Sequence, residues 1–463
     1  MSDLSEYRSP FSWRYASPEM RDIWSEEYKR KCWRKIWVAL AQVQQEYGLV
    51  KPDQVADLVA HQDQIDLPRA MEIEEELQHD LMAEVHTYAE QAKIGGGIIH
   101  FGATSMDIED NAEAMRLKAS LDLINKNLRA LLGIMADLIT TTADLPLIAF
   151  THLQPAEPST LGYRLAQTAQ DLLTDYDHLI SIAGSVKGKG FKGAVGTAAS
   201  YSQLFGADQL EAFEEKLSVH LNLPFYPIAT QTYPRKQDYF ILSALAALAQ
   251  TIYKFGFDLR FLQSPPIGEL SEPFGSRQIG SSAMPFKRNP IRSEKLDSLG
   301  RYVAQLPRIA WDNAAHSLLE RTLDDSANRR VILPEGFLAI DEMLKTITAI
   351  LSDLRINHAA IERNLKTYGP FAATEKVLLG CVQKGADRQE MHEVIRQLSM
   401  KAWESVQQNG ANPLLQYLAE DAVIRKYLSA TELATLMDHT NHIGYAPKKA
   451  RELALELRQR LAA

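Results

Sequence analysis

The sequence has little cysteine and no excess of positive charge. Only two cysteines, Cys32 and Cys381, occur in 463 residues. This excludes a disulfide framework and favours a reducing compartment, so we expect a cytoplasmic protein. The formal net charge is −9, and this acidity argues against a nucleic-acid-binding surface. No signal peptide is expected, because the N-terminus has no basic region followed by an apolar run.

Long apolar runs and the usual metal and cofactor motifs are also missing. The longest uncharged stretch, 239–253, is shorter than the ~20 apolar residues of a membrane span, and we predict a buried core helix there. No His-Glu-x-x-His pattern occurs, and His439 and His442 are interpreted as lacking carboxylate or cysteine partners. The run Gly188–Gly193, with two lysines, does not fit the phosphate-loop pattern; we favour a flexible turn over a phosphate contact. We therefore expect no metal, no cofactor and no membrane partner.

Helical periodicity is abundant. Apolar residues step by three and four along 117–138 and again along 241–262, as in long helices packed nearly parallel. Further long helices are predicted over about 159–185, from about Arg292, and from the N-cap signal at Asp325–Ser326. No alternating strand pattern appears. The fold class is therefore mainly α, with a central long-helix bundle whose leftover faces are available to other subunits.

Shorter helices flank this bundle. On the N-terminal side they are predicted over 25–47 and 72–91, and the run Gly95–Gly97 is predicted to mark a boundary. After about Arg355 the helices are again short. We predict three helical domains: an N-terminal domain over 1–104, the central bundle over 105–356, and a C-terminal domain over 357–463.

The most informative stretch is residues 280–294, which we call the serine segment. It places Ser281 and Ser282 after a glycine, with Lys287 and Asn289 a few residues on. Its glycine and prolines resist regular structure, so it is a shaped loop rich in hydroxyls and cations, suited to a small anion and to proton transfer. A plain surface loop is the alternative. The segment resembles the signature of the fumarase/aspartase superfamily, and most closely its adenylosuccinate lyase branch.

Chemistry-bearing residues also gather at other helix breaks. Thr104 and Ser105 precede a helix, where hydroxyls either bind an anion or simply cap the helix. His152 lies between prolines, off any regular helix; it is either structural or a proton donor near neutrality. The stretch 320–330 carries three arginines that suit a phosphate or carboxylates, unless they only form local Asp–Arg pairs.

The resemblance covers nearly the whole chain and implies roles for these residues. It implies that Ser281 is the catalytic base, that His152 is the general acid, and that Lys287 supports the charge of the base. Glu294 is a candidate carboxylate partner for His152. The implied substrate contacts are Arg14, Tyr15, His79, Asp80, Thr104, Ser105, Thr151, Gln231, Asn289, Lys295, Arg321, Ser326 and Arg330. Two positions depart from the family pattern, since Gln78 and Lys295 stand where it has arginine.

The resemblance further implies elimination of fumarate from adenylosuccinate, giving AMP, and from succinylaminoimidazole carboxamide ribotide, giving AICAR. It also implies a homotetramer whose active sites are shared between subunits. Two alternatives remain at this point. One is another fumarate-releasing lyase such as argininosuccinate lyase, and the other is a catalytically silent structural homologue.

Overall fold

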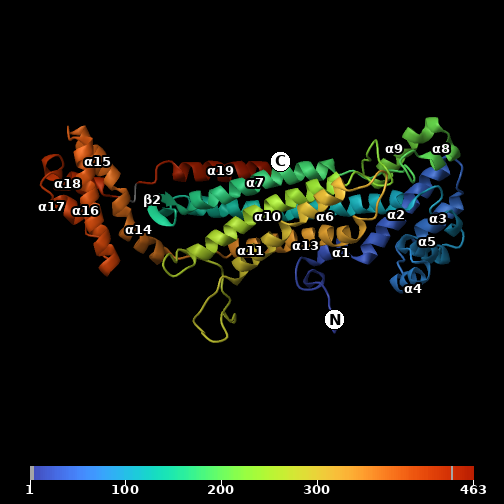
Figure 1. The fold of residues 1–463 in the computed structure, drawn as a ribbon, viewed down its shortest axis with the longest axis horizontal. Helices are drawn as coiled ribbons and strands as arrows, with labels where there is room; N and C mark the ends of the chain where they lie inside the picture. The colour runs from blue at the N-terminus through green and yellow to red at the C-terminus, as the bar shows by residue number, and fades with distance from the viewer. Residues whose placement is uncertain (1–4, 439–441, 463) are drawn as a thin grey trace. The chain divides into compact units, whose positions relative to one another are not determined.

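The computed structural model describes residues 5–438 and 442–462 and confirms a mainly α fold (Figure 1). The helices of the first half are α1 (Pro18–Ile23), α2 (Glu26–Glu46), α3 (Pro52–His61), α4 (Leu67–Leu77), α5 (Asp80–Gln91), α6 (Ser105–Thr142), α7 (Leu161–Ser185), α8 (Ala199–Phe205) and α9 (Leu210–Leu221). Those of the second half are α10 (Lys236–Leu262), α11 (Ile291–Val303), α12 (Leu306–Ala315), α13 (Ser326–Leu351), α14 (His358–Ala372), α15 (Thr374–Gln383), α16 (Arg388–Asn409), α17 (Leu414–Glu420), α18 (Ala430–Leu436) and α19 (Ala446–Ala462). The strands are β1 (Pro146–Thr151), β2 (Gln154–Thr160), β3 (Leu270–Ser271) and β4 (Arg355–Ile356), paired antiparallel as β1–β2 and β3–β4.

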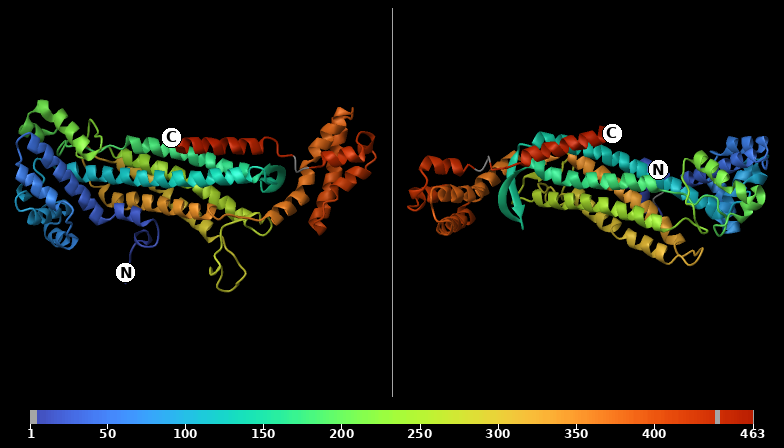
Figure 2. Two further views of the ribbon diagram at one scale, coloured as in Figure 1. Left: turned by 180° about the vertical axis from the view of Figure 1, so that it is seen from behind. Right: turned by 90° about the horizontal axis from the view of Figure 1, so that it is seen from above.

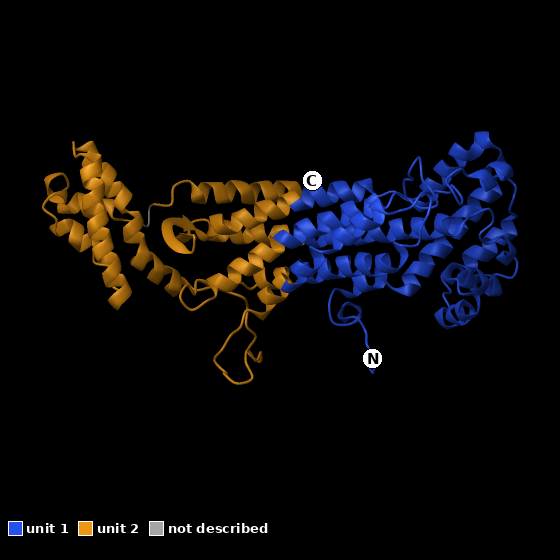
Figure 3. Cartoon of the chain, in the orientation of Figure 1, with its two compact units in different colours: residues 1–128, 175–250, 298–345 blue, residues 129–174, 251–297, 346–463 orange. Residues whose placement is uncertain are grey.

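The chain divides into two compact units (Figure 3). Unit 1 comprises residues 1–128, 175–250 and 298–345, and unit 2 comprises 129–174, 251–297 and 346–463. The unit boundaries fall inside α6, α7, α10, α11 and α13, so each of these helices contributes residues to both units. The division into three domains stays a prediction.

In unit 1 the parts of α6, α10 and α13 run alongside one another (Figures 1 and 2). The helices α10 and α13 approach closely at Gly336, where an added Cβ would lie 2.9 Å from a methyl carbon of Leu242. A side-chain bond from Asn127 to Asp341, 3.1 Å long, joins α6 to α13. The apolar stripes predicted along 117–138 and 241–262 are buried wherever they fall in this unit. Small residues at the contacts therefore allow the helices to pack as a bundle.

Unit 2 contains the remaining parts of these helices and the C-terminal helices. Arg260 on α10 bonds to Asp297 on α11 at 2.6 Å, and Gly162 at the start of α7 lies against the backbone of Ala143. Arg458 on α19 bonds to Asp137 on α6 at 2.6 Å. The helices α15 to α18 enclose a separate apolar cluster. Helix α14 packs against the hairpin of β1 and β2.

Two sequence predictions were wrong in detail. The helix predicted over 72–91 is two helices, because Gln78 takes a left-handed backbone conformation (φ 54°) that ends α4, and His79 caps α5. The hairpin of β1 and β2 was missed because its strands are short and β2 carries two prolines, so no alternation of apolar and polar residues marks it.

Helix α10 is the one helix among the described residues that is long and apolar enough to cross a membrane, by length and composition alone. The structure instead buries Ile241, Leu245, Leu248 and Ile252 in protein. The predicted buried core helix over 239–253 is thereby confirmed.

The run Gly188–Gly193 is held by buried ion pairs. The Lys189 ammonium donates to Asp107 at 2.5 Å and is fully buried, and the Lys192 ammonium donates to Glu214 at 2.7 Å. Asp107 also accepts from the backbone amides of Thr104 and Gly193. Both lysines are thus occupied by protein carboxylates, and this run anchors the start of α6 instead of forming the flexible turn that the sequence predicted.

We predict that Lys189→Met destabilises unit 1 by about 3–5 kcal/mol, because it leaves the Asp107 carboxylate buried without its cation. Thermal and urea unfolding would measure the loss. Lys216→Met is the matched control, since Lys216 pairs with Glu46 at 2.6 Å on the surface and its loss should leave Tm unchanged. Equal stability of the two variants would contradict the anchoring role.

Candidate active site

Unit 1 contains a hollow of about 180 Å³ that we call the arginine hollow. Residues from α2, α5, α6 and α13 line it. Four of the predicted substrate contacts are among them: Asp80, Arg321, Ser326 and Arg330. The structure therefore brings together residues up to 250 positions apart in the sequence (330 minus 80) at one concave surface.

The arginines of the stretch 320–330 have different surroundings. Arg330 faces the hollow with 65% of its side chain exposed, and its guanidinium lies 3.6 Å from Asp80. Arg321 donates to Asp325 at 2.8 Å, so for this arginine the structure shows a local Asp–Arg pair, the alternative to anion binding. Arg329 is engaged inside the protein by Asp238 and by the hydroxyl of Tyr233, both at 2.7 Å. Arg330 is thus the most available of the three for an incoming anion.

A buried charge network fixes this arginine stretch. Arg235 donates to Asp325 at 2.6 Å and to Asp110 at 3.0 Å. Burial acts to raise the pKa of the Asp325 carboxyl, but the charges of Arg235 and its arginine neighbours outweigh burial and lower it below its usual range. Asp325 therefore stays ionised and ties the start of α13 to α6 through one guanidinium.

The predicted hydroxyl pair lies beside the histidine–aspartate pair. The Ser105 hydroxyl lies 3.5 Å from Nε2 of His79, whose other ring nitrogen is 3.5 Å from the Met82 amide. The amide of Thr104 donates to Asp107 at 3.1 Å. His79, Asp80 and Ser105 are therefore neighbours, at the adjoining N-termini of α5 and α6, where the helix dipoles favour an anion.

Other predicted contacts are placed differently. The amide of Gln231 donates to the carbonyl of Glu320 at 3.2 Å, so Gln231 lies next to the arginine stretch. Arg14 and Tyr15 do not line the arginine hollow. The amide of Ala16 instead binds Glu342, which lies about 18 Å along α13 from Arg330 at 1.5 Å per residue. The structure of the single chain thus separates these two residues from the arginines.

In unit 2, His152 occupies the tip of the β1–β2 hairpin. Thr151 pairs with Gln154, so His152 and Leu153 form a two-residue turn, and both have positive φ angles of 51° and 60°. Such turns favour Asn-Gly, because glycine and asparagine tolerate a positive φ angle, whereas most other side chains, including leucine, are strained there. The exposed imidazole therefore lies at the tip of a strained turn.

The serine segment folds back on itself. An added Cβ at Gly280 would lie 2.0 Å from the carbonyl oxygen of Lys287, so only glycine allows these two backbones to meet. The Asn289 amide group donates to the Gly280 carbonyl at 2.8 Å. The Ser281 hydroxyl oxygen accepts from the amides of Ala283 at 3.3 Å and Met284 at 3.1 Å. Two backbone dipoles thus point at the oxygen that would carry charge in a serine base.

The segment ends in α11, whose first turn is capped from outside. Buried Glu272 accepts from the amides of Arg292 and Ser293 at 3.2 and 3.0 Å. Glu294 belongs to this first turn, and Lys295 follows it directly. Within the described residues no hydrogen bond or ion pair joins His152 to Glu294, so their partnership stays a prediction.

The reading of His442 as lacking carboxylate partners was wrong. Its ring lies with Glu157 and Glu375 in unit 2, with the ligand atoms all within 4.8 Å of one another. These carboxylates come from distant parts of the sequence, so no local motif could indicate them. His439 lies outside the described residues.

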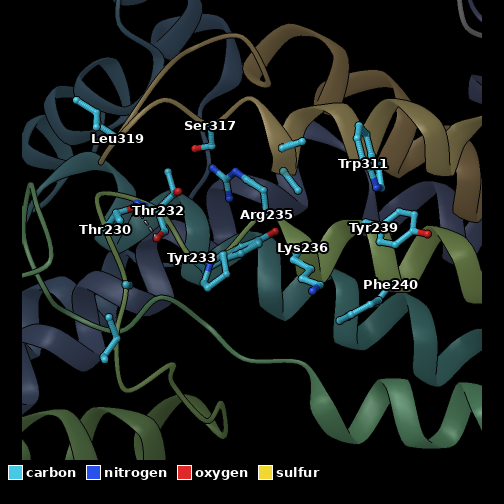
Figure 4. A pocket seen from close by; sticks show the side chains of 15 residues that line it. Thr230, Thr232, Tyr233, Arg235, Lys236, Tyr239, Phe240, Trp311, Ser317 and Leu319 are labelled. Carbon is cyan, nitrogen blue, oxygen red and sulfur yellow. Dashed lines mark hydrogen bonds between the residues drawn. The ribbon is translucent and has the colours of Figure 1, made fainter.

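A second hollow, of about 700 Å³, lies in unit 1 between the segment 228–240 and the end of α12 (Figure 4). Thr230, Thr232, Tyr239 and Trp311 are among its lining residues. None of the predicted site residues lines it, and the candidate site is therefore the smaller arginine hollow.

Known proteins resemble this chain over nearly its full length. A lyase family model matches residues 19–304, and a model of the adenylosuccinate lyase C-terminus matches 370–453. The adenylosuccinate lyase of Saccharomyces cerevisiae is 37% identical over 457 residues, which is 97% of this chain and 94% of that protein. This chain belongs to the adenylosuccinate lyase family. The adenylosuccinate lyase of Pyrococcus horikoshii, 37% identical over 96% of both chains, extends the likeness to an archaeon.

Solved structures of other enzymes have the same fold as this chain. A 3-carboxy-cis,cis-muconate lactonizing enzyme from Pseudomonas putida has a TM-score of 0.87 at 25% identity, covering 98% of this chain and 99% of that one. A fumarate lyase from Mesorhizobium sp. BNC1 has a TM-score of 0.84 at 23% identity, covering 97% and 99%. The helical fold is thus shared beyond the adenylosuccinate lyase family.

The departure at position 78 has a structural consequence. Gln78 takes a left-handed conformation, and its side-chain amide donates to the carbonyl of Glu75 at 2.7 Å. The side chain therefore serves the helix end. An arginine here would add a cation next to His79 and Asp80, which this chain lacks.

We predict that Arg330→Ala weakens the binding of AMP about 10- to 150-fold, because a lost charge-assisted hydrogen bond costs ~1.5–3 kcal/mol. Titration calorimetry would measure the change. Arg308→Ala is the control, since Arg308 pairs with Asp312 on the exposed face of α12 and should leave binding unchanged. Equal weakening of adenosine, which has no phosphate, would contradict the assignment of Arg330 to a phosphate.

Proposed function

We propose that this chain catalyses the adenylosuccinate lyase reaction. It releases fumarate from adenylosuccinate to leave AMP, and from succinylaminoimidazole carboxamide ribotide to leave AICAR. The observation that carries this proposal is the 37% identity to adenylosuccinate lyases over nearly the full length of the chain. The arginine hollow adds a physical reason, because a nucleotide monophosphate needs clustered cations on an otherwise acidic chain.

The first chemical step is removal of a proton from the carbon beside a carboxylate, which we assign to Ser281. A serine hydroxyl is a poor base unless its alkoxide is stabilised. The amides of Ala283 and Met284 already point at its oxygen, and the backbone contact between Gly280 and Lys287 keeps the lysine nearby. The charge that develops on the substrate carboxylate also needs fixed donors, which Lys287 and Asn289 can supply. Asn289 uses one of its two N–H groups on Gly280, which leaves the other for substrate.

The second step is protonation of the departing purine nitrogen, which we assign to His152. The hairpin tip holds this imidazole exposed and away from the body of its own strands. Thr151, the last residue of β1, would contact substrate beside it. Positioned acids and bases each contribute ~10²–10⁴-fold to a rate.

The substrate's two ends are assigned to different residues. Arg321, Ser326 and Arg330 would hold the phosphate, with Gln231 beside them. Thr104 and Ser105 would hold the succinyl carboxylate at the start of α6, next to His79. In this arrangement the phosphate binds to arginines, and the succinyl carboxylate binds at a helix N-terminus.

The alternatives fit less well. Argininosuccinate has no phosphate, so the arginine hollow would have no purpose in an argininosuccinate lyase. A silent structural homologue would not need the strained turn at His152 or the amides aimed at Ser281.

We further propose a cytoplasmic homotetramer with shared sites. Large apolar side chains on the bundle helices are exposed in the single chain, among them Phe240 and Trp311 at 48% and Phe257 at 56%. Such exposure is costly unless another subunit covers it. Arg14 and Tyr15, which the single chain keeps away from the arginine hollow, could then serve the site of another subunit.

We predict that Ser281→Ala lowers kcat by at least ~10²-fold while substrate affinity stays nearly intact, since only the base is lost. The absorbance change on cleavage of adenylosuccinate would measure it. Ser282→Ala should do less, because Ser282 only neighbours the base. If Ser281→Ala kept more than about a tenth of the wild-type kcat, Ser281 would not be the base.

We also predict that two inactive variants complement each other. Mixing His152→Gln with Ser281→Ala protein and allowing subunits to exchange should restore activity to about a quarter of the sites, because those sites draw both intact residues from different chains. Sedimentation and mass spectrometry would verify exchange. No recovery despite proven exchange, or a fully active monomer, would sink the shared-site proposal.

A further inference from the structure

We propose that Glu109 is a binding residue whose contact with the phosphate in the arginine hollow couples phosphate binding to the uptake of one proton. The phosphate dianion would bind together with the neutral Glu109 carboxyl, which donates its O–H to the phosphate. This inference rests on the proposed function, because it takes the arginine hollow as the nucleotide-phosphate end. The proton comes from solvent, and no covalent bond to carbon, nitrogen or phosphorus changes.

The position of Glu109 supports this role. It lies on α6 four residues after Ser105, so the two side chains project from the same face of the helix. It lines the arginine hollow together with Arg321, Ser326 and Arg330. A carboxyl group thus stands inside the cavity that is to receive the most highly charged part of the substrate.

Glu109 differs from the other acids of this hollow in having no partner. It is partly buried, and no hydrogen bond or ion pair to it occurs among the described residues. Glu113, one turn further along α6, pairs with Arg116 at 3.2 Å, and Asp110 pairs with Arg235 at 3.0 Å. An unpaired, partly buried carboxylate is costly, whereas a neutral carboxyl is not.

The charged groups facing Glu109 come from every neighbouring helix. Asp80 on α5 and Asp110 on α6 add negative charge, while Lys29 on α2 and Arg330 on α13 add positive charge. Both cations are already shared, since Lys29 lies 2.6 Å from Glu26 and Arg330 lies 3.6 Å from Asp80. His79 adjoins Asp80 and is a further titratable group at the same end.

These surroundings set the sign of the pH dependence. Burial, and less strongly the charges of Asp80 and Asp110, raise the pKa of Glu109, while Lys29 and Arg330 oppose the rise, and the net effect is a pKa of about 7. The carboxyl is therefore mostly neutral at pH 6 and mostly ionised at pH 8. A phosphate dianion binds better when Glu109 is neutral. The affinity of the protein for the phosphate should therefore fall roughly tenfold between pH 6 and pH 8, because the fraction of protein with a neutral Glu109 falls by that factor. Ionisation of the phosphate itself, with a second pKa of ~6, acts in the opposite direction.

Calorimetry with AMP tests the coupling directly. Titrating AMP at pH 7.5 in two buffers of different ionisation enthalpy gives the number of protons exchanged. The wild-type protein should take up about three quarters of a proton per AMP. A carboxyl whose pKa lies about half a unit below the buffer pH is about three-quarters ionised before AMP binds, and that share must be protonated on binding. Glu109→Gln should abolish this uptake and bind AMP more tightly at pH 8. Glu109→Asp should retain uptake with a shifted midpoint, and Glu113→Gln is the matched control that should retain it unchanged.

The outcomes separate this inference from the proposed function. If AMP binds normally but the wild type takes up no proton, or if Glu109→Gln takes up as many, the role of Glu109 is refuted and the lyase proposal stands. Equal uptake with adenosine would also refute the link to phosphate. Failure of wild-type protein to bind AMP at all would overturn the nucleotide assignment of the hollow, and this inference with it.

Discussion

The candidate site of unit 1 depends on one buried guanidinium. Arg235 stands between Asp110 on α6 and Asp325 before α13, and all three side chains are nearly excluded from solvent. These segments are far apart in sequence, and apolar packing alone would leave their relative register adjustable. A charged group that must find both carboxylates leaves only one register acceptable.

Such a network adds little net free energy to the packing of the helices. Removing charges from water costs several kcal/mol per ion, and the attraction between them only roughly offsets that cost. The main effect of the network is to fix the orientation of the side chains around it. Because Asp325 is held by Arg235, it in turn holds Arg321, and the first turn of α13 points Arg330 toward Asp80. Arg329, one residue earlier, is committed to Asp238 and cannot compete for substrate.

The two ends of the chemistry are built in contrasting ways. The arginine hollow uses helix starts, and buried ion pairs hold the helices that carry its side chains. In unit 2, His152 lies on a tight hairpin and is exposed, and Ser281 lies on a loop that narrows at Gly280 and is partly buried. Exposed elements of this kind can close around a substrate and exclude water during proton transfer. In the proposed mechanism, the phosphate end therefore lies at helix starts, whereas the proposed acid and base lie on a turn and a loop.

The sequence by itself determined the helical fold class, because seams of period 3.5 such as Leu117–Leu121–Ile124 have no other stable arrangement. It also determined the adenylosuccinate lyase family, through the long serine segment and the stretch 320–330. It could not show that the two lysines of 188–193 are buried, that a hairpin presents His152, or that His442 meets two glutamates. The lysine and His442 contacts join residues tens to hundreds of positions apart, and local patterns carry no record of such contacts. The hairpin pairs residues only 3 to 14 positions apart, and it was missed because the prolines of β2 hide the strand pattern. Glu109 is the clearest case, since only tertiary structure reveals a carboxyl left unpaired among arginines.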